Sequence, residues 1–126
     1  MACARSRRVV ARRRDCRDQV GALVARGEIW WVEHPDAGRR PFLVLTRQAA
    51  IPVLNSILAA PATRTIRQIP TEVVLDEADG MPEECALSLD NVTTVPRELF
   101  KDRITRLSIG RMNEVCRALA LASGCA

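Results

Sequence analysis

The amino-acid sequence predicts a small α+β domain that is mostly β: a partial antiparallel barrel with short helices and a C-terminal amphipathic helix. Three observations lead to this fold class. The chain has 126 residues, which is the length of one domain. From residue 26 onward, short apolar and β-branched runs alternate with turns that contain Pro, Gly or Asp. After residue 108, apolar residues recur every three or four positions, which is the spacing of a helix.

Seven short strands are expected in the body of the domain. They cover residues 28–33, 41–46, 55–60, 71–76, 85–89, 92–95 and 104–107. The run 41–46 is almost wholly apolar, so it is expected to be buried. Pro61 is expected to end the third strand, and Asp79-Gly80 to form a tight turn. Single helical turns are expected at Ile51-Pro52 and over residues 96–100, where Pro96 supplies the first position.

The last element is expected to be an amphipathic helix. Ser108 can cap its N-terminus, and Gly124 can end it. The apolar face of this helix is expected to consist of Met112, Val115, Cys116, Leu119 and Ala120.

Positive charge is concentrated at the N-terminus. Residues 1–26 hold eight arginines and two aspartates, a net charge of +6, whereas the whole chain carries +4, so residues 27–126 carry −2. We therefore divide the chain into a basic extension over residues 1–25 and a domain over residues 26–126. The extension is interpreted first as a solvated segment, or as one that arises from a start codon assigned upstream of the real one. An arm that binds nucleic acid ranks below these, and a mitochondrial-type presequence is a weak alternative. An RNA site in the domain has to depend on the local placement of arginines.

Cysteine usage favours a reducing cytoplasm. The five cysteines are an odd number without a Cys-x-x-Cys pair, which disfavours a disulfide framework and a zinc site. Cys85 and Cys116 are expected to be small buried apolar residues rather than catalytic thiols. No apolar run reaches the ~18 residues of a membrane span, and no secretory signal is recognisable.

Several kinds of catalytic site are disfavoured. The glycines are dispersed, so no phosphate-binding loop is expected, and a single histidine excludes a two-histidine ribonuclease. We expect neither a metal nor a cofactor. An acidic group is interpreted as a surface loop rather than a magnesium site; it comprises Asp76, Glu77, Asp79, Glu83 and Glu84.

Two polar segments border the predicted apolar strands. Residues 36–46 place Arg39 and Arg40 at the mouth of a strand, and residues 61–70 form a connection rich in Arg and Thr. Guanidinium and hydroxyl groups are suitable partners for a phosphodiester. On composition alone, ordinary exposed loop charges are the better interpretation.

Four segments in a fixed order give these residues a family context. They are Arg26-Gly-Glu-Ile-Trp-Trp-Val32, Gly38-Arg-Arg-Pro-Phe-Leu-Val-Leu45, Ala60-Pro-Ala-Thr63 followed by Pro70-Thr-Glu-Val-Val-Leu75, and Ser88-Leu-Asp-Asn-Val-Thr-Thr-Val95. Over residues 26–123 the chain resembles the MazF/PemK family of toxins from type II toxin–antitoxin modules. The resemblance implies a small SH3-like β-barrel, a homodimer, and metal-independent cleavage of single-stranded RNA to a 2′,3′-cyclic phosphate and a 5′-hydroxyl.

The resemblance also implies roles for individual residues. Arg40 is expected to stabilise charge on the phosphorane, and Thr63 to hold the scissile phosphate. The further RNA-binding candidates are Arg39, Arg64, Thr65, Arg67, Asp90 and Asn91, and His34 or Asp36 is a candidate acid or base.

Two further expectations concern partners. The resemblance implies a small MazE-like antitoxin with a flexible acidic tail that covers the arginines. A different function on the same architecture is a non-catalytic toxin that binds DNA gyrase through residues 112–124. Trp30 and Trp31 are neighbours on a strand and face opposite sides, so one is expected in the core and the other at a dimer surface or in the RNA groove.

Overall fold

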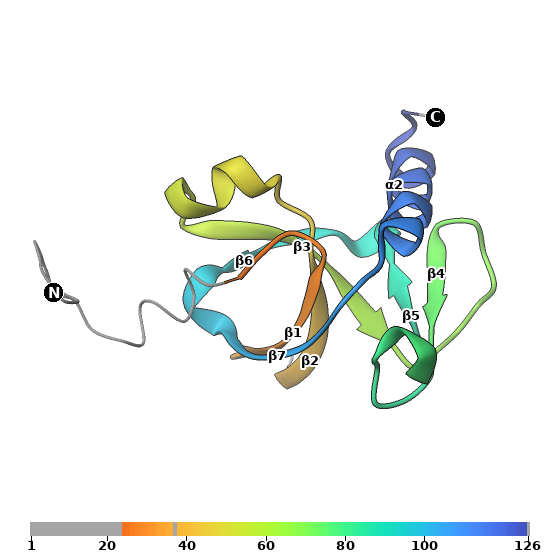
Figure 1. The fold of residues 1–126 in the computed structure, drawn as a ribbon, viewed down its shortest axis with the longest axis horizontal. Coiled ribbons are helices and arrows are strands. Elements are labelled where there is room, and N and C mark those ends of the chain that lie inside the picture. Colours follow the sequence, from red (N-terminus) through yellow and green to blue (C-terminus); the bar gives the residue numbers. More distant parts are fainter. Residues whose placement is uncertain (1–23, 37, 126) are drawn as a thin grey trace, which may run out of the picture.

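The computed structural model describes residues 24–36 and 38–125, and it shows one antiparallel sheet and a C-terminal helix (Figure 1). The strands are β1 (Glu28–His34), β2 (Gly38–Val44), β3 (Ser56–Thr63), β4 (Glu72–Leu75), β5 (Cys85–Ser88), β6 (Thr93–Pro96) and β7 (Phe100–Arg106). Short 3-10 helices are η2 (Gln48–Val53), η3 (Glu77–Asp79), η4 (Leu89–Asn91) and η5 (Arg97–Leu99), and the long helix is α2 (Ile109–Ser123). The predicted basic extension lies almost wholly outside the described residues.

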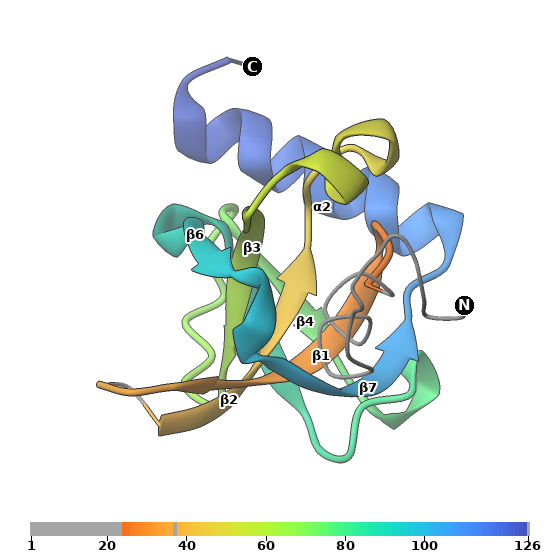
Figure 2. The ribbon, with the colours of Figure 1, turned by 90° about the vertical axis from the view of Figure 1, so that its left-hand side faces the viewer.

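The sheet is strongly curved but open, which confirms the predicted partial barrel (Figure 2). Its strand order is β4-β5-β3-β2-β1-β7, and β6 pairs with β3 outside this path. All pairs are antiparallel. Among the described residues, no helix is long and apolar enough to cross a membrane.

Strand β3 connects the two halves of the sheet, and it is longer than expected. The prediction that Pro61 ends this strand was wrong, because Pro61 lies inside it and pairs with Phe42 on β2. Pro61 is the last residue of β3 that pairs with β2, and Ala62 is the first that pairs with β5. Proline has no N–H to donate, so it is tolerated where a strand changes partners.

Two other strand boundaries also differ from the sequence prediction. Strand β2 begins at Gly38 instead of residue 41, because the β1–β2 hairpin keeps its register as far as the pair His34 and Gly38. Arg39 and Arg40 therefore lie within a strand and not at its mouth. Strand β7 begins at Phe100 instead of residue 104, because β1 continues to pair with it as far as Val32.

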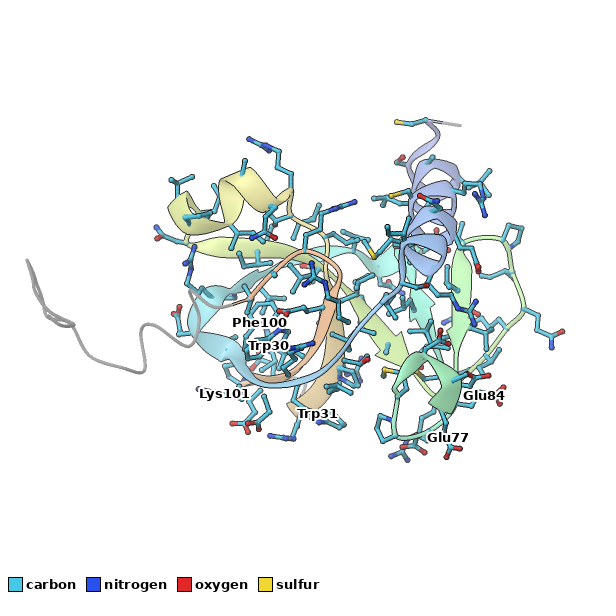
Figure 3. All side chains as sticks on the ribbon, in the orientation of Figure 1. Trp30, Trp31, Glu77, Glu84, Phe100 and Lys101 are labelled. Atoms are coloured by element: carbon cyan, nitrogen blue, oxygen red, sulfur yellow. The ribbon has the colours of Figure 1, made fainter. Side chains whose placement is uncertain are left out.

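Side chains of the sheet form two hydrophobic cores. The helix-side core lies between α2 and strands β4 and β5 and includes Leu75, Leu87 and Val115. The hairpin-side core lies between β1, β2, β3 and β6 and includes Trp30 and Phe100, which lie close together in Figure 3. Trp30 is thus the core tryptophan, as expected for one of the pair, and its indole N–H donates to Glu28 at 3.0 Å.

Helix α2 has the predicted ends but a slightly different buried face. The Ser108 hydroxyl accepts a hydrogen bond from the Arg111 N–H at 3.1 Å, and Gly124 ends the helix with a φ of 77°. Val115 and Ala118 are the buried positions. Cys116 is exposed, so the expectation that it is buried was wrong, whereas Cys85 is buried as expected. The side of α2 that faces the sheet includes residue 118, and residue 116 lies away from it.

The acidic segment after β4 is part of the folded framework. Asp79 accepts hydrogen bonds from the Arg111 guanidinium of α2 at 2.9 and 3.1 Å. Burial by itself would raise the pKa of Asp79, but hydrogen bonds from Arg111 and the Asp76 backbone, with the Arg111 charge, lower it overall. Gly80 completes the predicted turn with a φ of 91°, and a Cβ there would overlap the Thr105 side chain.

Candidate active site

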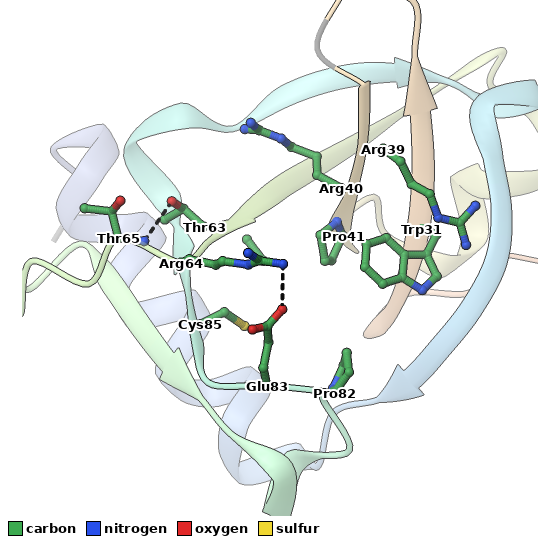
Figure 4. A pocket seen from close by; sticks show the side chains of 11 residues that line it. Trp31, Arg39, Arg40, Pro41, Thr63, Arg64, Thr65, Pro82, Glu83 and Cys85 are labelled. Atoms are coloured by element: carbon green, nitrogen blue, oxygen red, sulfur yellow. Dashed lines mark hydrogen bonds and ion pairs between the residues drawn. The ribbon is translucent and has the colours of Figure 1, made fainter.

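A cleft of about 330 Å³ opens beside the first hairpin (Figure 4). We call it the arginine cleft. Its walls come from β1, β2, the end of β3 with the loop that follows, and the segment that precedes β5. They comprise Trp31, Arg39, Arg40, Pro41, Ala62, Thr63, Arg64, Thr65, Pro82, Glu83 and Cys85. Three separate parts of the chain therefore meet in one concave site.

The sheet register explains why Arg40 and Thr63 share this cleft. Phe42 of β2 is paired with Pro61 of β3. Arg40 lies two residues before Phe42 on β2, where it pairs with Val32 of β1, and Thr63 lies two residues after Pro61, where β3 has left β2 and pairs with Ala86 of β5. Both side chains are thereby attached to paired strands, which hold their backbones rigidly.

The three arginines of the cleft differ in their electrostatic environment. Arg39 makes salt bridges with Glu33 at 2.9 Å and Asp102 at 3.3 Å. Arg64 makes one with Glu83 at 2.9 Å. Within the described ranges 24–36 and 38–125, Arg40 has no carboxylate partner and no side-chain hydrogen bond, so its charge is available to an anion.

The hydroxyl groups of the cleft lie at the start of the β3–β4 loop. The Thr63 side-chain oxygen accepts a hydrogen bond from the Thr65 N–H at 3.2 Å, which turns the chain at the end of β3. A hydroxyl that accepts one hydrogen bond can still donate its own proton. Thr63 can therefore donate to an anion that Arg40 attracts.

The structure brings five of the predicted site residues together, namely Arg39, Arg40, Thr63, Arg64 and Thr65. The other five do not line the cleft. Arg67 lies beside Glu72, Asp90 accepts a hydrogen bond from Thr71 at 2.5 Å, and Asn91 donates to Ser88 at 2.7 Å. His34 accepts from the Asp36 N–H at 3.1 Å at the end of the β1–β2 hairpin. Their predicted roles stay predictions.

Six residues of the cleft were not among the predicted site residues, namely Trp31, Pro41, Ala62, Pro82, Glu83 and Cys85. The alternation of β1 indicated that one tryptophan lies outside the core, at a dimer surface or in the RNA groove, but not which of the two it is. Glu83 was interpreted as part of an acidic surface loop. Its contact with Arg64 joins residues 19 positions apart and has no local sequence signal.

Cys85 lies at the inner wall of the cleft, but its environment is unsuited to a nucleophile. Burial raises the pKa of its thiol, and the negative charges of Glu83, Asp79 and Glu84 raise it further. The neutral thiol is therefore the dominant form near pH 7. The described residues also contain no group of three His, Cys, Asp or Glu side chains arranged to hold a metal ion.

The fold and the cleft together define the class of protein: a small, open, antiparallel β-barrel protein with a C-terminal helix and an arginine-lined cleft. A sequence model described as the PemK-like, MazF-like toxin of type II toxin–antitoxin systems matches residues 25–123. The chain belongs to this family.

Individual relatives are similar over nearly their whole length. A protein of Mycobacterium tuberculosis described as a probable endoribonuclease, MazF5, is 47% identical over 105 residues, which are 82% of this chain and 96% of the relative. The probable endoribonuclease MazF2 of the same species is 39% identical over 101 residues, which are 79% of this chain and 98% of the relative.

Solved structures show the same fold. The Mycobacterium tuberculosis toxin MazF-mt6 is 28% identical, with a TM-score of 0.73 and coverage of 79% of this chain and 98% of that one. An endoribonuclease solved in complex with its cognate antitoxin, from a mycobacterial species, is 25% identical, with a TM-score of 0.75 and coverage of 82% and 98%.

Proposed function

We propose that this chain is a toxin of a type II toxin–antitoxin system that cleaves single-stranded RNA without a metal ion, as an mRNA interferase. The observation that carries the proposal is that Arg40, without an ion-pair partner among the described residues, lines the arginine cleft together with Thr63. The 47% identity to a probable endoribonuclease supports the reaction class.

The reaction is an internal transfer at phosphorus. The 2′-oxygen of a ribose bonds to the adjacent phosphorus, and the bond from phosphorus to the 5′-oxygen breaks. The 2′-hydroxyl proton passes to a base, and the 5′-oxygen takes up a proton, which leaves a 2′,3′-cyclic phosphate and a 5′-hydroxyl. Arg40 stabilises the negative charge on the phosphorane oxygens and can donate to the leaving oxygen. Thr63 donates to the phosphate and maintains the in-line geometry.

Other residues extend the contact with RNA in this proposal. Arg64, Thr65 and Arg67 belong to the β3–β4 loop, where a strand of RNA leaving the cleft would pass, and Asp90 and Asn91 follow β5. His34 and Asp36 are proposed to assist proton transfer. Both lie at the end of the β1–β2 hairpin, outside the residues that line the cleft.

The proposal includes two partners. A second copy of the chain forms a homodimer, for which the exposed apolar side chains of Val53, Leu54 and Leu58 are suitable contact residues. An antitoxin with an acidic tail neutralises the cleft arginines; a similar endoribonuclease has been solved with its cognate antitoxin. We place the protein in the cytoplasm, where its RNA substrate is found.

The test is cleavage of a single-stranded RNA by the purified protein in EDTA. We expect 5′-hydroxyl ends, and we expect Arg40→Ala to reduce the rate by about 10²- to 10³-fold, because a donor to the transition-state charge is lost. Arg47→Ala, an exposed arginine outside the cleft, is the matched control and should keep the wild-type rate. Equal rates for wild type and Arg40→Ala would refute the assignment, and inhibition of gyrase without RNA cleavage would replace it.

A further inference from the structure

The arginine cleft has two chemically different parts. Arg40, Thr63 and Thr65 form a polar part suited to a phosphate. Opposite them, Trp31 and Pro82 present apolar surface, and Glu83 adds a carboxylate. A carboxylate repels phosphate, so this second part is suited to a different portion of a nucleic acid.

The Trp31 ring is held in place by Arg39. The Arg39 guanidinium lies 4.9 Å from the centre of the ring, and salt bridges to Glu33 on β1 and Asp102 on β7 fix that guanidinium from two sides. In Figure 4 the ring lies between Arg39 on one side and Pro41 and Glu83 on the other. The side of the ring that faces the cleft is therefore ordered in advance for stacking, which lowers the entropic cost of binding a planar group.

Glu83 and Arg64 together present a defined hydrogen-bonding edge. The Arg64 guanidinium forms an ion pair with Glu83, with 2.9 Å between Nη2 and Oε2. Glu83 Oε1 has no partner among residues 24–36 and 38–125. A guanidinium has five N–H donors, so Arg64 keeps donors free while this pair is intact. The pair thus offers a donor next to two acceptor atoms at the margin of the cleft.

Guanine is the base whose edge matches this order of groups. Its Watson–Crick edge has an acceptor at O6 followed by two donors at N1 and N2. Adenine and cytosine place a ring nitrogen acceptor beside their amino group, which would face the carboxylate, and uracil has only one donor. Single-stranded RNA exposes these edges, because its bases are not paired.

We propose that Trp31, Arg64 and Glu83 form a subsite for an unpaired guanine base of the RNA. Trp31 stacks on the ring, Glu83 accepts from N1 and N2, and Arg64 donates to O6. This inference rests on the proposed function, which supplies the RNA, and it identifies one base that the cleft selects.

The test measures binding without turnover. The ligands are fluorescein-labelled heptamers of 2′-fluorouridine with one central guanine, hypoxanthine or adenine; they are single-stranded and lack the 2′-hydroxyl nucleophile. We expect wild-type protein to bind the guanine heptamer on the order of 10- to 100-fold more tightly than the adenine heptamer. Hypoxanthine lacks the N2 amino group, so its affinity should be intermediate.

Two variants test whether Glu83 causes the preference for guanine. Glu83→Gln replaces one acceptor with a donor, so its affinities for the three heptamers should become equal within about 3-fold of one another. Glu84→Gln is the matched control, because Glu84 is the neighbouring carboxylate and lies with Glu77 in the acidic segment outside the cleft (Figure 3). It should keep the wild-type preference. The Glu83 side chain is 55% exposed, so the unfolding midpoint of Glu83→Gln should match the wild type.

The outcomes separate this inference from the proposed function. Equal affinities of wild-type protein for the heptamers, including no measurable binding to any, overturn the guanine subsite, as does a preference that survives in Glu83→Gln. A protein that prefers guanine but cuts no RNA refutes the nuclease and leaves the subsite standing. A protein that cuts RNA without a guanine preference refutes the subsite and leaves the nuclease standing.

Discussion

Arg40 and Arg111 are the same residue type in two contrasting settings. The Arg111 side chain is 29% exposed and makes two hydrogen bonds to Asp79 and one to Glu114, which connect helix α2 to the segment after β4. Arg40 is exposed on β2 and has no ion-pair partner among the described residues. The charge of Arg111 is satisfied within the fold, whereas the charge of Arg40 is directed into a cleft.

This difference shows how one small domain separates stability from function. Removing one partner of a partly buried ion pair leaves the other charge uncompensated and lowers the free energy of unfolding, and a paired charge leaves little attraction for a ligand. A cation without a partner adds nothing to stability, but it is already positioned for an anion. Replacing Arg40 should therefore change the cleavage rate and leave the free energy of unfolding nearly unchanged. Replacing Arg111 should change the free energy of unfolding and leave the cleavage rate nearly unchanged.

The largest expected effect is on the ligand side of this comparison. Thr63→Val removes a hydroxyl of the arginine cleft and keeps the shape of the side chain, so we expect RNA cleavage to fall by about 10²-fold. Thr63→Ser retains the hydroxyl and should stay within about 5-fold of the wild type. Initial rates on a fluorogenic single-stranded RNA measure both variants. Cleavage by Thr63→Val as fast as by Thr63→Ser would contradict the role of the hydroxyl.

A smaller effect is expected on the fold side. Arg111→Ala leaves Asp79 without its guanidinium partner, and we expect the free energy of unfolding to fall by about 1–3 kcal/mol. The cleavage rate per folded molecule should be unchanged, because Arg111 does not line the arginine cleft. Urea unfolding followed by circular dichroism measures the loss. Arg40→Ala is the control, and its free energy of unfolding should stay within ~0.5 kcal/mol of the wild type.

The smallest effect is a pH dependence of the same ion pair. Burial works to raise the pKa of Asp79, but the hydrogen bonds and charge of Arg111 hold it below its ordinary value in the folded protein. Its contribution to stability is therefore complete above the unfolded pKa and is lost as the pH falls through the folded pKa. The difference in unfolding free energy between wild type and Asp79→Asn should be larger at pH 6 than at pH 3. A difference that does not depend on pH would show that the charge of Asp79 contributes nothing.

The sequence predicted the fold well where the signal is local. All seven strands and the final helix were predicted, because alternation, turn residues and the caps at Ser108 and Gly124 depend on neighbouring residues. The errors in strand boundaries occurred where pairing with a strand that is distant in the sequence determines where a strand begins or ends. Pro61 continues β3 because β5 takes over from β2 at that point, and Phe100 begins β7 because β1 is beside it.

The candidate site was predicted only in part for a similar reason. The family resemblance identified Arg40 and Thr63, and the structure places them in one cleft. Glu83 and Trp31 carry no local signal for a shared site, since their meeting depends on the curvature of the sheet. The sequence also does not reveal that Arg39 and Arg64 are paired with carboxylates while Arg40 has no such partner among the described residues.

The position of β7 has a consequence for synthesis of the protein. Strand β1 gains its second neighbour only when residues 100–106 are available, and Asp102 on β7 is also needed to fix Arg39 against Trp31. A growing chain on the ribosome holds every residue of the cleft well before it can complete this edge of the sheet. We therefore expect the cleft to reach its final geometry during synthesis only once residues 100–106 have paired with β1.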